Sequence, residues 1–159
     1  MPKKVSTVKS VELTDDLLEG QAAVLLLVLK SATEIIATTD RVLRNVGSQL
    51  TTREWDVLAF VSAYGPIRPS ELLRHVVLTG NPQTLSSILD RLQQREFVSR
   101  KTDHSDARSV LVTITEDGSN AVRTVFPTLL RKVIEPFNLH YTEEELTNMR
   151  KLLDAYIAN

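Results

Sequence analysis

The hydrophobic positions of this chain repeat at helical spacing over most of its length. From about Asp15 to Asn45, apolar side chains recur every three or four residues, as one face of a helix requires. Within this stretch, residues 22–29 are apolar on nearly every side. A helix that is apolar all round is buried all round, and a chain of 159 residues offers little to surround it. We therefore expect a second subunit to cover this helix. Burial within the chain is the alternative.

A capping box predicts the start of the second helix. Thr51 and Glu54 have the spacing at which each side chain can bond an exposed backbone N–H of the other. Gly65-Pro66 is expected to end this helix. Its predicted inner face comprises Trp55, Leu58, Ala59 and Ser62.

Proline and asparagine mark the starts of the next two helices. Pro69 suits the first turn of a third helix that runs to Val76, after a one-residue strand at Ile67. Asn81 is a good N-cap and Pro82 a good first residue for the fourth helix. Four apolar residues of this helix share one face, at i, i+3, i+4 and i+7: Leu85, Ile88, Leu89 and Leu92. The opposite face is polar and carries Gln83, Ser87, Asp90 and Gln94.

A short hairpin and two further helices complete the pattern. Strands are expected at residues 97–102 and 110–114, with a polar loop at 103–109. Thr115 caps a helix to about residue 137, which Pro127 should kink and Pro136 should end. Thr142 and Glu145 form a second capping box before the terminal helix. The fold class expected is mainly α, with six helices and a small β-wing.

A helix that feeds a hairpin is the layout of a winged helix-turn-helix, which points to double-stranded DNA as a partner. The recognition helix of such a unit places its N-terminal residues at base edges, here Gln83, Thr84 and Ser87. Arg91 and the helix N-terminus suit phosphates. A merely solvated polar face is the alternative.

The wing carries the basic residues Arg100, Lys101 and Arg108. An arginine at a hairpin tip can enter the narrow minor groove, where negative potential is concentrated. Asp106 can orient the guanidinium of Arg108 through charge-assisted hydrogen bonds. An ordinary charged hairpin is the alternative, because surface ion pairs contribute little stability.

The overall charge weighs against nucleic-acid binding, but the distribution of charge does not. The formal net charge is −1, whereas residues 68–108 have seven basic against five acidic side chains, a net charge of +2. The absence of cysteine excludes disulfides and thiolate zinc sites. The N-terminus has no signal-peptide pattern, and the longest apolar run is too short to cross a bilayer. We expect a soluble cytoplasmic protein with no membrane partner.

Several short segments occur in a characteristic order. They are Leu50-Thr51 with Trp55-Asp56-Val57-Leu58, Gly65-Pro66-Ile67, Ser70-Glu71-Leu72, Leu89-Asp90-Arg91-Leu92 and Phe97-Val98-Ser99-Arg100. The most specific segment is Asp103-x-x-Asp106-x-Arg108-Ser109, followed by Val112-x-Ile114-Thr115-x-x-Gly118. In this order and spacing, residues 51–118 resemble the MarR family of bacterial transcriptional regulators.

The resemblance implies one MarR-like domain over residues 14–159, after a flexible arm at residues 1–13. Residues 50–118 would be the winged-helix DNA-binding lobe, flanked by dimerisation helices at 14–46 and 119–159. It also implies a homodimer on a pseudo-palindromic operator, with repression relieved by a small ligand, often an aromatic acid. The implied DNA-binding residues are Arg68, Ser70, Asn81, Gln83, Thr84, Ser86, Ser87, Arg91, Arg100, Lys101, Asp106 and Arg108.

Two residues depart from the family pattern, and the ligand site is less specific than the DNA site. Pro82 replaces a more usual polar residue, and Arg68 stands where a small helix cap is common, although an arginine can reach a phosphate. The small-molecule effector is expected between the dimer helices and the lobe, near Arg41, Arg44, Trp55 and Tyr64. Core packing is the favoured alternative for Trp55.

No catalytic constellation is visible, so we expect neither an enzyme nor a cofactor. The three histidines, His75, His104 and His140, have no metal-ligand spacing, and no glycine-rich phosphate loop is present. The loop at 103–106 contains triad residue types, but neighbours in one loop seldom reach triad geometry. The rival to a DNA-binding repressor is a winged-helix dimer that has lost DNA binding and serves as a protein-interaction scaffold.

Overall fold

The computed structural model describes residues 21–103 and 106–157, without the side chains of residues 21, 22, 106–108 and 137. The expected arm at 1–13, the expected helix start near Asp15 and the residue His104 lie outside the described residues. The backbone of Asp106 and Arg108 belongs to a strand, and their side chains lie outside the description.

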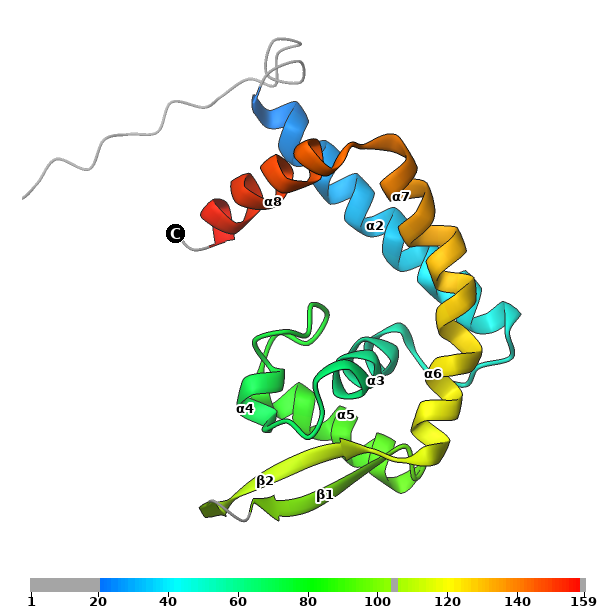
Figure 1. Cartoon of the computed structure of the whole chain (residues 1–159), viewed down its shortest axis with the longest axis vertical. Coiled ribbons are helices and arrows are strands. Elements are labelled where there is room, and N and C mark those ends of the chain that lie inside the picture. The colour runs from blue at the N-terminus through cyan, green and yellow to red at the C-terminus, as the bar shows by residue number, and fades with distance from the viewer. Residues whose placement is uncertain (1–20, 104–105, 158–159) are drawn as a thin grey trace, which may run out of the picture. The chain divides into compact units, whose positions relative to one another are not determined.

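The described residues are mostly helical and include one two-stranded sheet (Figure 1). The elements are α2 (Gln21–Asn45), α3 (Thr52–Tyr64), α4 (Pro69–Leu72), α5 (Pro82–Gln94), β1 (Val98–Asp103), β2 (Asp106–Ile114), α6 (Glu116–Leu129), the π-helical turn η1 (Leu130–Ile134), α7 (Glu135–His140) and α8 (Glu143–Ile157). This confirms the predicted class, mainly α with a small β-wing. The chain divides into two compact units, Met1–Ile35 and Ile36–Asn159.

The described part of the first unit is the N-terminal stretch of α2. Its six apolar residues from Val24 to Leu29 are each between 41% and 64% exposed in the single chain. The helix expected from the sequence is therefore confirmed over Gln21–Asn45, and its apolar run is not buried within the described chain. Its cover by a second subunit stays a prediction.

The hydrophobic core lies in the second unit and joins α2, α3, α5, the hairpin and α6. Its fully buried members include Leu43, Val57, Leu58, Val61, Leu72, Leu85, Ile88, Leu89, Leu92, Val98, Val112 and Val125. The predicted inner face of α3 was partly wrong, because Ser62 is exposed while Val57 and Val61 are buried. At 100° per residue, Ser62 lies about 80° from the centre of the buried face. Trp55 lies still further round, but its long side chain reaches the core.

Three element boundaries differ from the prediction. The helix α4 ends at Leu72 and not at Val76; the backbone then continues in tight turns, with the His75 and Val76 N–H groups bonded to the Leu72 carbonyl. The strands β1 and β2 extend the hairpin ladder to the pair Asp103 and Asp106, so most of the predicted polar loop is strand. Backbone pairing extends the strands here, where residues 103–109 have no alternating apolar pattern that would predict them.

Both prolines of the C-terminal helices lie inside helical segments, and the prediction that Pro136 ends the helix was wrong. The helix α6 continues through Pro127 to Leu129, and the wider turn η1 follows it. Pro136 does not end the helix, which continues from η1 through Pro136 to His140.

The terminal helix begins at the second predicted capping box. The Thr142 N–H donates to the Glu145 carboxylate at 2.8 Å, and the Glu145 N–H donates to the Thr142 hydroxyl at 3.3 Å. The helix α8 buries no residue, and its apolar side chains Leu152 and Tyr156 are 73% and 71% exposed. Across the described residues, no helix combines the length and apolar content of a membrane span.

Candidate nucleic-acid interface

The helix α5 has the N-cap, the buried apolar stripe and the exposed polar face that a recognition helix needs. The Asn81 side chain accepts a hydrogen bond from the Thr84 N–H at 2.8 Å, which confirms the predicted N-cap. The predicted apolar stripe is at most 2% exposed along its whole length. Gln83, Ser86 and Ser87 are exposed on the opposite side, and Thr84 is half-buried. The Ser87 hydroxyl donates to the Gln83 carbonyl at 3.1 Å, so its oxygen can still accept.

A half-buried aspartate holds the turn that leads into α5. The Asp56 carboxylate accepts from the backbone N–H groups of Val77 at 2.9 Å and Leu78 at 2.8 Å. Burial raises the pKa of Asp56, although these two N–H groups act in the opposite direction. The sequence offered no direct signal for this role, because the contact joins residues more than twenty positions apart.

Glu54 connects the start of α3 to the recognition helix. Its carboxylate accepts from the Thr51 N–H at 2.9 Å, which completes the predicted capping box. It also accepts from Nε of Arg91 at 3.0 Å and lies 3.6 Å from Nη1 of Arg95, whose guanidinium lies over the Phe97 ring. Burial alone raises the pKa of Glu54, but the Thr51 N–H and hydroxyl and Arg91 outweigh burial, so the pKa is lowered.

We expect Glu54→Gln to destabilise the fold by about 1–3 kcal/mol at pH 7, because it removes a buried charge that two arginines share. A carboxylate with a lowered pKa stabilises the fold above its unfolded value, near 4.5, and loses this effect as the pH falls through the folded value. The difference in free energy of unfolding between wild type and variant should therefore shrink below about pH 4.5. Urea unfolding between pH 3 and pH 7 measures this difference.

Glu145→Gln is the matched control, since Glu145 has the same capping role at Thr142 but is fully exposed. Glutamine also serves in a capping box, so this variant should unfold almost as the wild type does. Equal losses from both variants at pH 7 would contradict a special role for the Glu54 pairs with Arg91 and Arg95.

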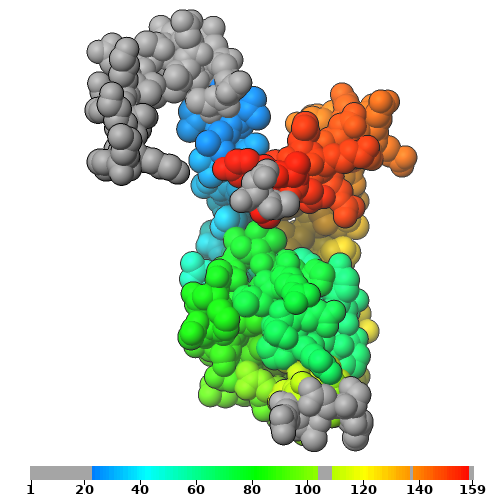
Figure 2. Space-filling model, turned by 90° about the vertical axis from the view of Figure 1, so that its left-hand side faces the viewer, coloured from blue at the N-terminus to red at the C-terminus, as the bar shows by residue number. Residues whose placement is uncertain are grey.

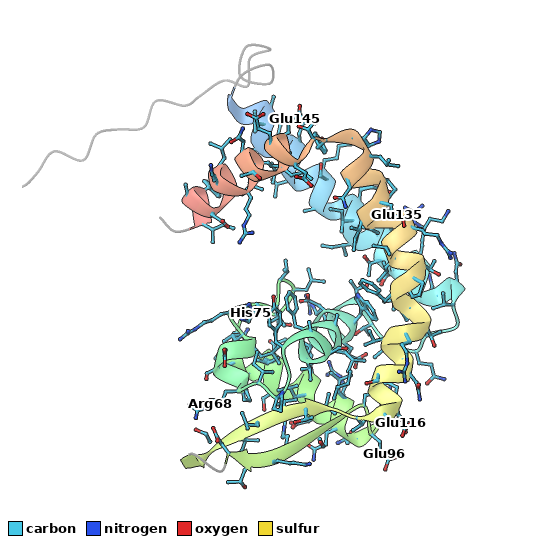
Figure 3. The ribbon with its side chains drawn as sticks, in the orientation of Figure 1. Arg68, His75, Glu96, Glu116, Glu135 and Glu145 are labelled. Carbon is cyan, nitrogen blue, oxygen red and sulfur yellow. The ribbon has the colours of Figure 1, made fainter. Side chains whose placement is uncertain are left out.

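The wing is an antiparallel hairpin whose base is bonded to two other segments. Strands β1 and β2 pair from Val98 with Ile114 to Asp103 with Asp106. The Ile67 backbone exchanges two hydrogen bonds with Val112, at 3.0 and 2.9 Å, which confirms the predicted one-residue strand. At the base, Glu96 and Glu116 lie where the hairpin meets α6 (Figure 3).

Each described arginine of the predicted DNA site is paired with a carboxylate. Arg68 donates to Asp103 at 2.6 Å, Arg91 to Glu54 at 3.0 Å, and Arg100 lies 2.7 Å from Asp90. The other predicted contacts with described side chains are exposed on α4 and β1 or lie at the α5 N-terminus: Ser70, Lys101 and Asn81. The structure thus brings α4, α5 and the wing into one lobe. The green atoms of its α4 and α5 region form one continuous face in Figure 2.

Two hollows flank Arg100 between α5 and the wing. The first, of about 430 Å³, is mostly apolar and is lined by Pro69, Ser70, Leu73, Pro82, Leu85, Ser86, Leu89, Arg100 and Val110. The second, of about 440 Å³, is polar and is lined by Asp90, Gln93, Gln94 and Arg100. Sequence reasoning did not find these hollows, because no local pattern shows how α4 and the hairpin meet α5.

The four predicted ligand residues line neither hollow. Trp55 is 8% exposed and belongs to the core, which confirms core packing, the alternative favoured for this residue. The ring of Tyr64 is stacked on those of Phe60 and His75, with centroids 5.9 and 4.8 Å away. Arg41 donates to the Thr38 hydroxyl and Arg44 to Asp40, both along α2. Within the described residues, no cluster of three or more His, Asp or Glu side chains could hold a metal ion.

Known proteins match this geometry and sequence. The family model "MarR family" matches residues 50–110, the region of α3, α4, α5 and most of the hairpin. The transcriptional regulator PecS of Dickeya dadantii is 32% identical over 136 residues, which cover 80% of this chain and 78% of PecS. The chain belongs to the MarR family.

Solved structures of other proteins share the fold. Sco3205 from Streptomyces coelicolor, solved in complex with DNA, has a TM-score of 0.74 at 18% identity, covering 95% of this chain and 91% of Sco3205. BpsR of Bordetella bronchiseptica, solved to explain regulation of its DNA binding by 6-hydroxynicotinic acid, has a TM-score of 0.69 at 20% identity, covering 89% of this chain and 96% of BpsR. This MarR-family protein is a winged-helix transcriptional regulator and not an enzyme.

Proposed function

We propose that this protein is a homodimeric, cytoplasmic repressor that binds a pseudo-palindromic DNA operator and is released from it by a small ligand. The observation that carries the DNA-binding part is the capped helix α5, whose N-terminal half exposes Gln83, Ser86 and Ser87. Ser86 also lines one hollow together with Arg100 and Val110 of the wing. Glutamine can bond adenine with both side-chain groups, and serine can serve several bases. These residues would read base edges in the major groove.

The dimer follows from the geometry that such an operator needs. Two recognition helices have to reach half-sites about one DNA turn, or roughly 34 Å, apart. The apolar run of α2, exposed in the single chain, has the character of a permanent subunit interface.

The ligand part is supported by BpsR, whose DNA binding is regulated by 6-hydroxynicotinic acid. Arg41 and Arg44 supply exposed guanidinium groups suited to a carboxylate, and the half-exposed ring of Tyr64 offers an aromatic surface. An aromatic acid is therefore the proposed class of ligand. It would act by biasing the separation of the two recognition helices.

The decisive test is binding to the promoter DNA that flanks the gene of this protein. Arg108→Ala should weaken this binding at least about tenfold, because the wing would lose a minor-groove contact. It should also lower the slope of log K against log salt concentration by about one for each wing. Arg53→Ala is the matched control, since Arg53 is exposed in the same lobe outside the proposed site. Fluorescence anisotropy at several salt concentrations measures both effects, and 6-hydroxynicotinic acid should release the wild-type complex.

The rival function is a winged-helix dimer that serves as a protein-interaction scaffold. The net charge of −1 and the pairing of each described arginine of the proposed site favour it. Wild-type protein without salt-dependent binding to any promoter DNA would exclude the repressor and leave the scaffold.

A further inference from the structure

The side chain of Arg68 is used to hold the wing. Its Nη2 and Nε donate to the same carboxylate oxygen of Asp103, at 2.6 and 3.1 Å. The side chain of Asp103 is only 11% exposed, whereas that of Arg68 is 42% exposed. Figure 3 places Arg68 on the side of the lobe where α4 approaches the hairpin. A buried carboxylate that receives two donors from one planar fork is held in a defined position.

Asp103 stands at the point where the regular hairpin gives way to its tip. The strand register shifts between Thr102 and Asp103, and Asp103 pairs with Asp106 across the end of the ladder. Arg108 follows two residues later on β2. A displacement of Asp103 would therefore move the paired end of the ladder, from which Arg108 follows on β2.

The segment at residues 67–68 is bonded to both strands of the wing. The Ile67 backbone is bonded to Val112 of β2, and the next side chain, Arg68, is bonded to Asp103 of β1. Because α4 begins at the following residue, the start of the helix-turn-helix and the wing share one junction. Two attachments at different points along the hairpin restrict both its position and its rotation.

The identity of residue 68 follows from this junction. Arg68 is the N-cap of α4, yet its side chain makes no capping hydrogen bond. The short side chains that cap helices well do not extend to a neighbouring strand. The helix start therefore lacks a side-chain cap, and the guanidinium instead reaches across to β1.

We propose that Arg68 and Asp103 form a positioning pair, which holds the wing tip at the distance from α5 that lets both contact one DNA duplex at once. This inference rests on the proposed DNA-binding function. It assigns Arg68 to the wing and not to a phosphate, and it makes Asp103 necessary for binding although its charge repels DNA. A second ion pair, between Arg100 of β1 and Asp90 of α5, braces the same strand from the recognition helix.

The test asks whether removing the negative charge of Asp103 strengthens or weakens DNA binding. Removing an acid from a DNA-binding surface strengthens binding through electrostatics alone. If Asp103 positions the wing, Asp103→Asn should instead weaken binding by about threefold to tenfold. The probe is a duplex that full-length wild-type protein selects from a random pool, and the loss should be smaller on random DNA. Asp117→Asn makes the same charge change at an exposed site of α6 and should not weaken binding.

Two further variants separate positioning from direct phosphate contact. Arg68→Gln with Asp103→Asn should weaken binding no more than either change alone, because both remove one interaction. Arg68→Lys keeps the charge but loses the planar fork, so positioning predicts a loss and a phosphate contact predicts retention. Thermal unfolding of each variant establishes that it is folded, and Arg68→Lys is the mildest change if another variant fails to fold.

Asp103→Asn that binds as well as wild type, or more tightly, would overturn the inference. If Arg68→Gln still weakened DNA binding in that case, Arg68 would be assigned a direct phosphate contact. If wild type selects no duplex from the pool, the proposed function itself fails, which is a separate outcome from a failure of the positioning pair.

Discussion

Leu29→Asp is expected to convert the protein into a monomer of about 18 kDa and to lower its affinity for a two-half-site operator at least about 100-fold. Leu29 is 55% exposed in the single chain, at the end of the apolar run of α2. A carboxylate there would remain unpaired in an apolar subunit interface, which is strongly unfavourable. A monomer would then bind each half-site independently and lose the gain from bivalent binding. Light scattering at micromolar concentration and anisotropy with the operator measure the two effects.

Ser31→Asp is the matched control for this prediction. Ser31 is exposed and lies about 200° around α2 from Leu29, so it is on the opposite face. The Ser31→Asp variant adds the same charge and should leave both the mass of the dimer and its affinity for the operator unchanged. A wild-type protein that scatters as a monomer, or a Leu29→Asp variant that remains a dimer, would refute the proposed role of this run.

Gly118→Ala is expected to destabilise the fold by about 3 kcal/mol or more and to lower the Tm by roughly 10 °C. A Cβ at this position would overlap the carbonyl oxygen of Phe97 and lie 2.8 Å from the Ile114 side chain. The Phe97 carbonyl already accepts from the Thr115 N–H at 3.1 Å, so it cannot move aside without breaking this bond. The close approach joins the base of the wing to α6. Differential scanning calorimetry measures the loss.

Gly80→Ala tests whether the effect belongs to this close contact. Nothing lies within 4 Å of a Cβ built at Gly80, in the turn before α5. Its substitution should change stability by less than about 1 kcal/mol, in either direction. Equal Tm values for the two variants would show that the approach of α6 to Phe97 is not tight in solution.

Local patterns were sufficient to place most of the helices. The capping boxes at Thr51 and Thr142, and the cap at Asn81, were found where the sequence predicted them, because caps involve residues only three apart. The buried stripe of α5 was also found, since its period is that of the helix itself. Boundaries failed where local signals are weak, as at the end of α4 and at the start of β2.

The candidate site was only partly visible in the sequence. Gln83 and Ser87 were expected on the exposed face of α5, and they are there. The partners of Arg68 and Arg91 were not expected, because they lie 35 and 37 residues away in the chain. No pattern within one element indicates which carboxylate another element will bring to it.

The sequence by itself thus determined the helices, their caps, the wing and the family of this protein. These features depend on neighbours within a few residues and on the period of the apolar positions. The tertiary structure alone decided that Arg68 is bound to Asp103 and that Glu54 holds Arg91. It also decided how closely Gly118 approaches Phe97. These contacts arise only when packing of the shared core brings distant segments together, and they join the wing, α3, α5 and α6 to one another.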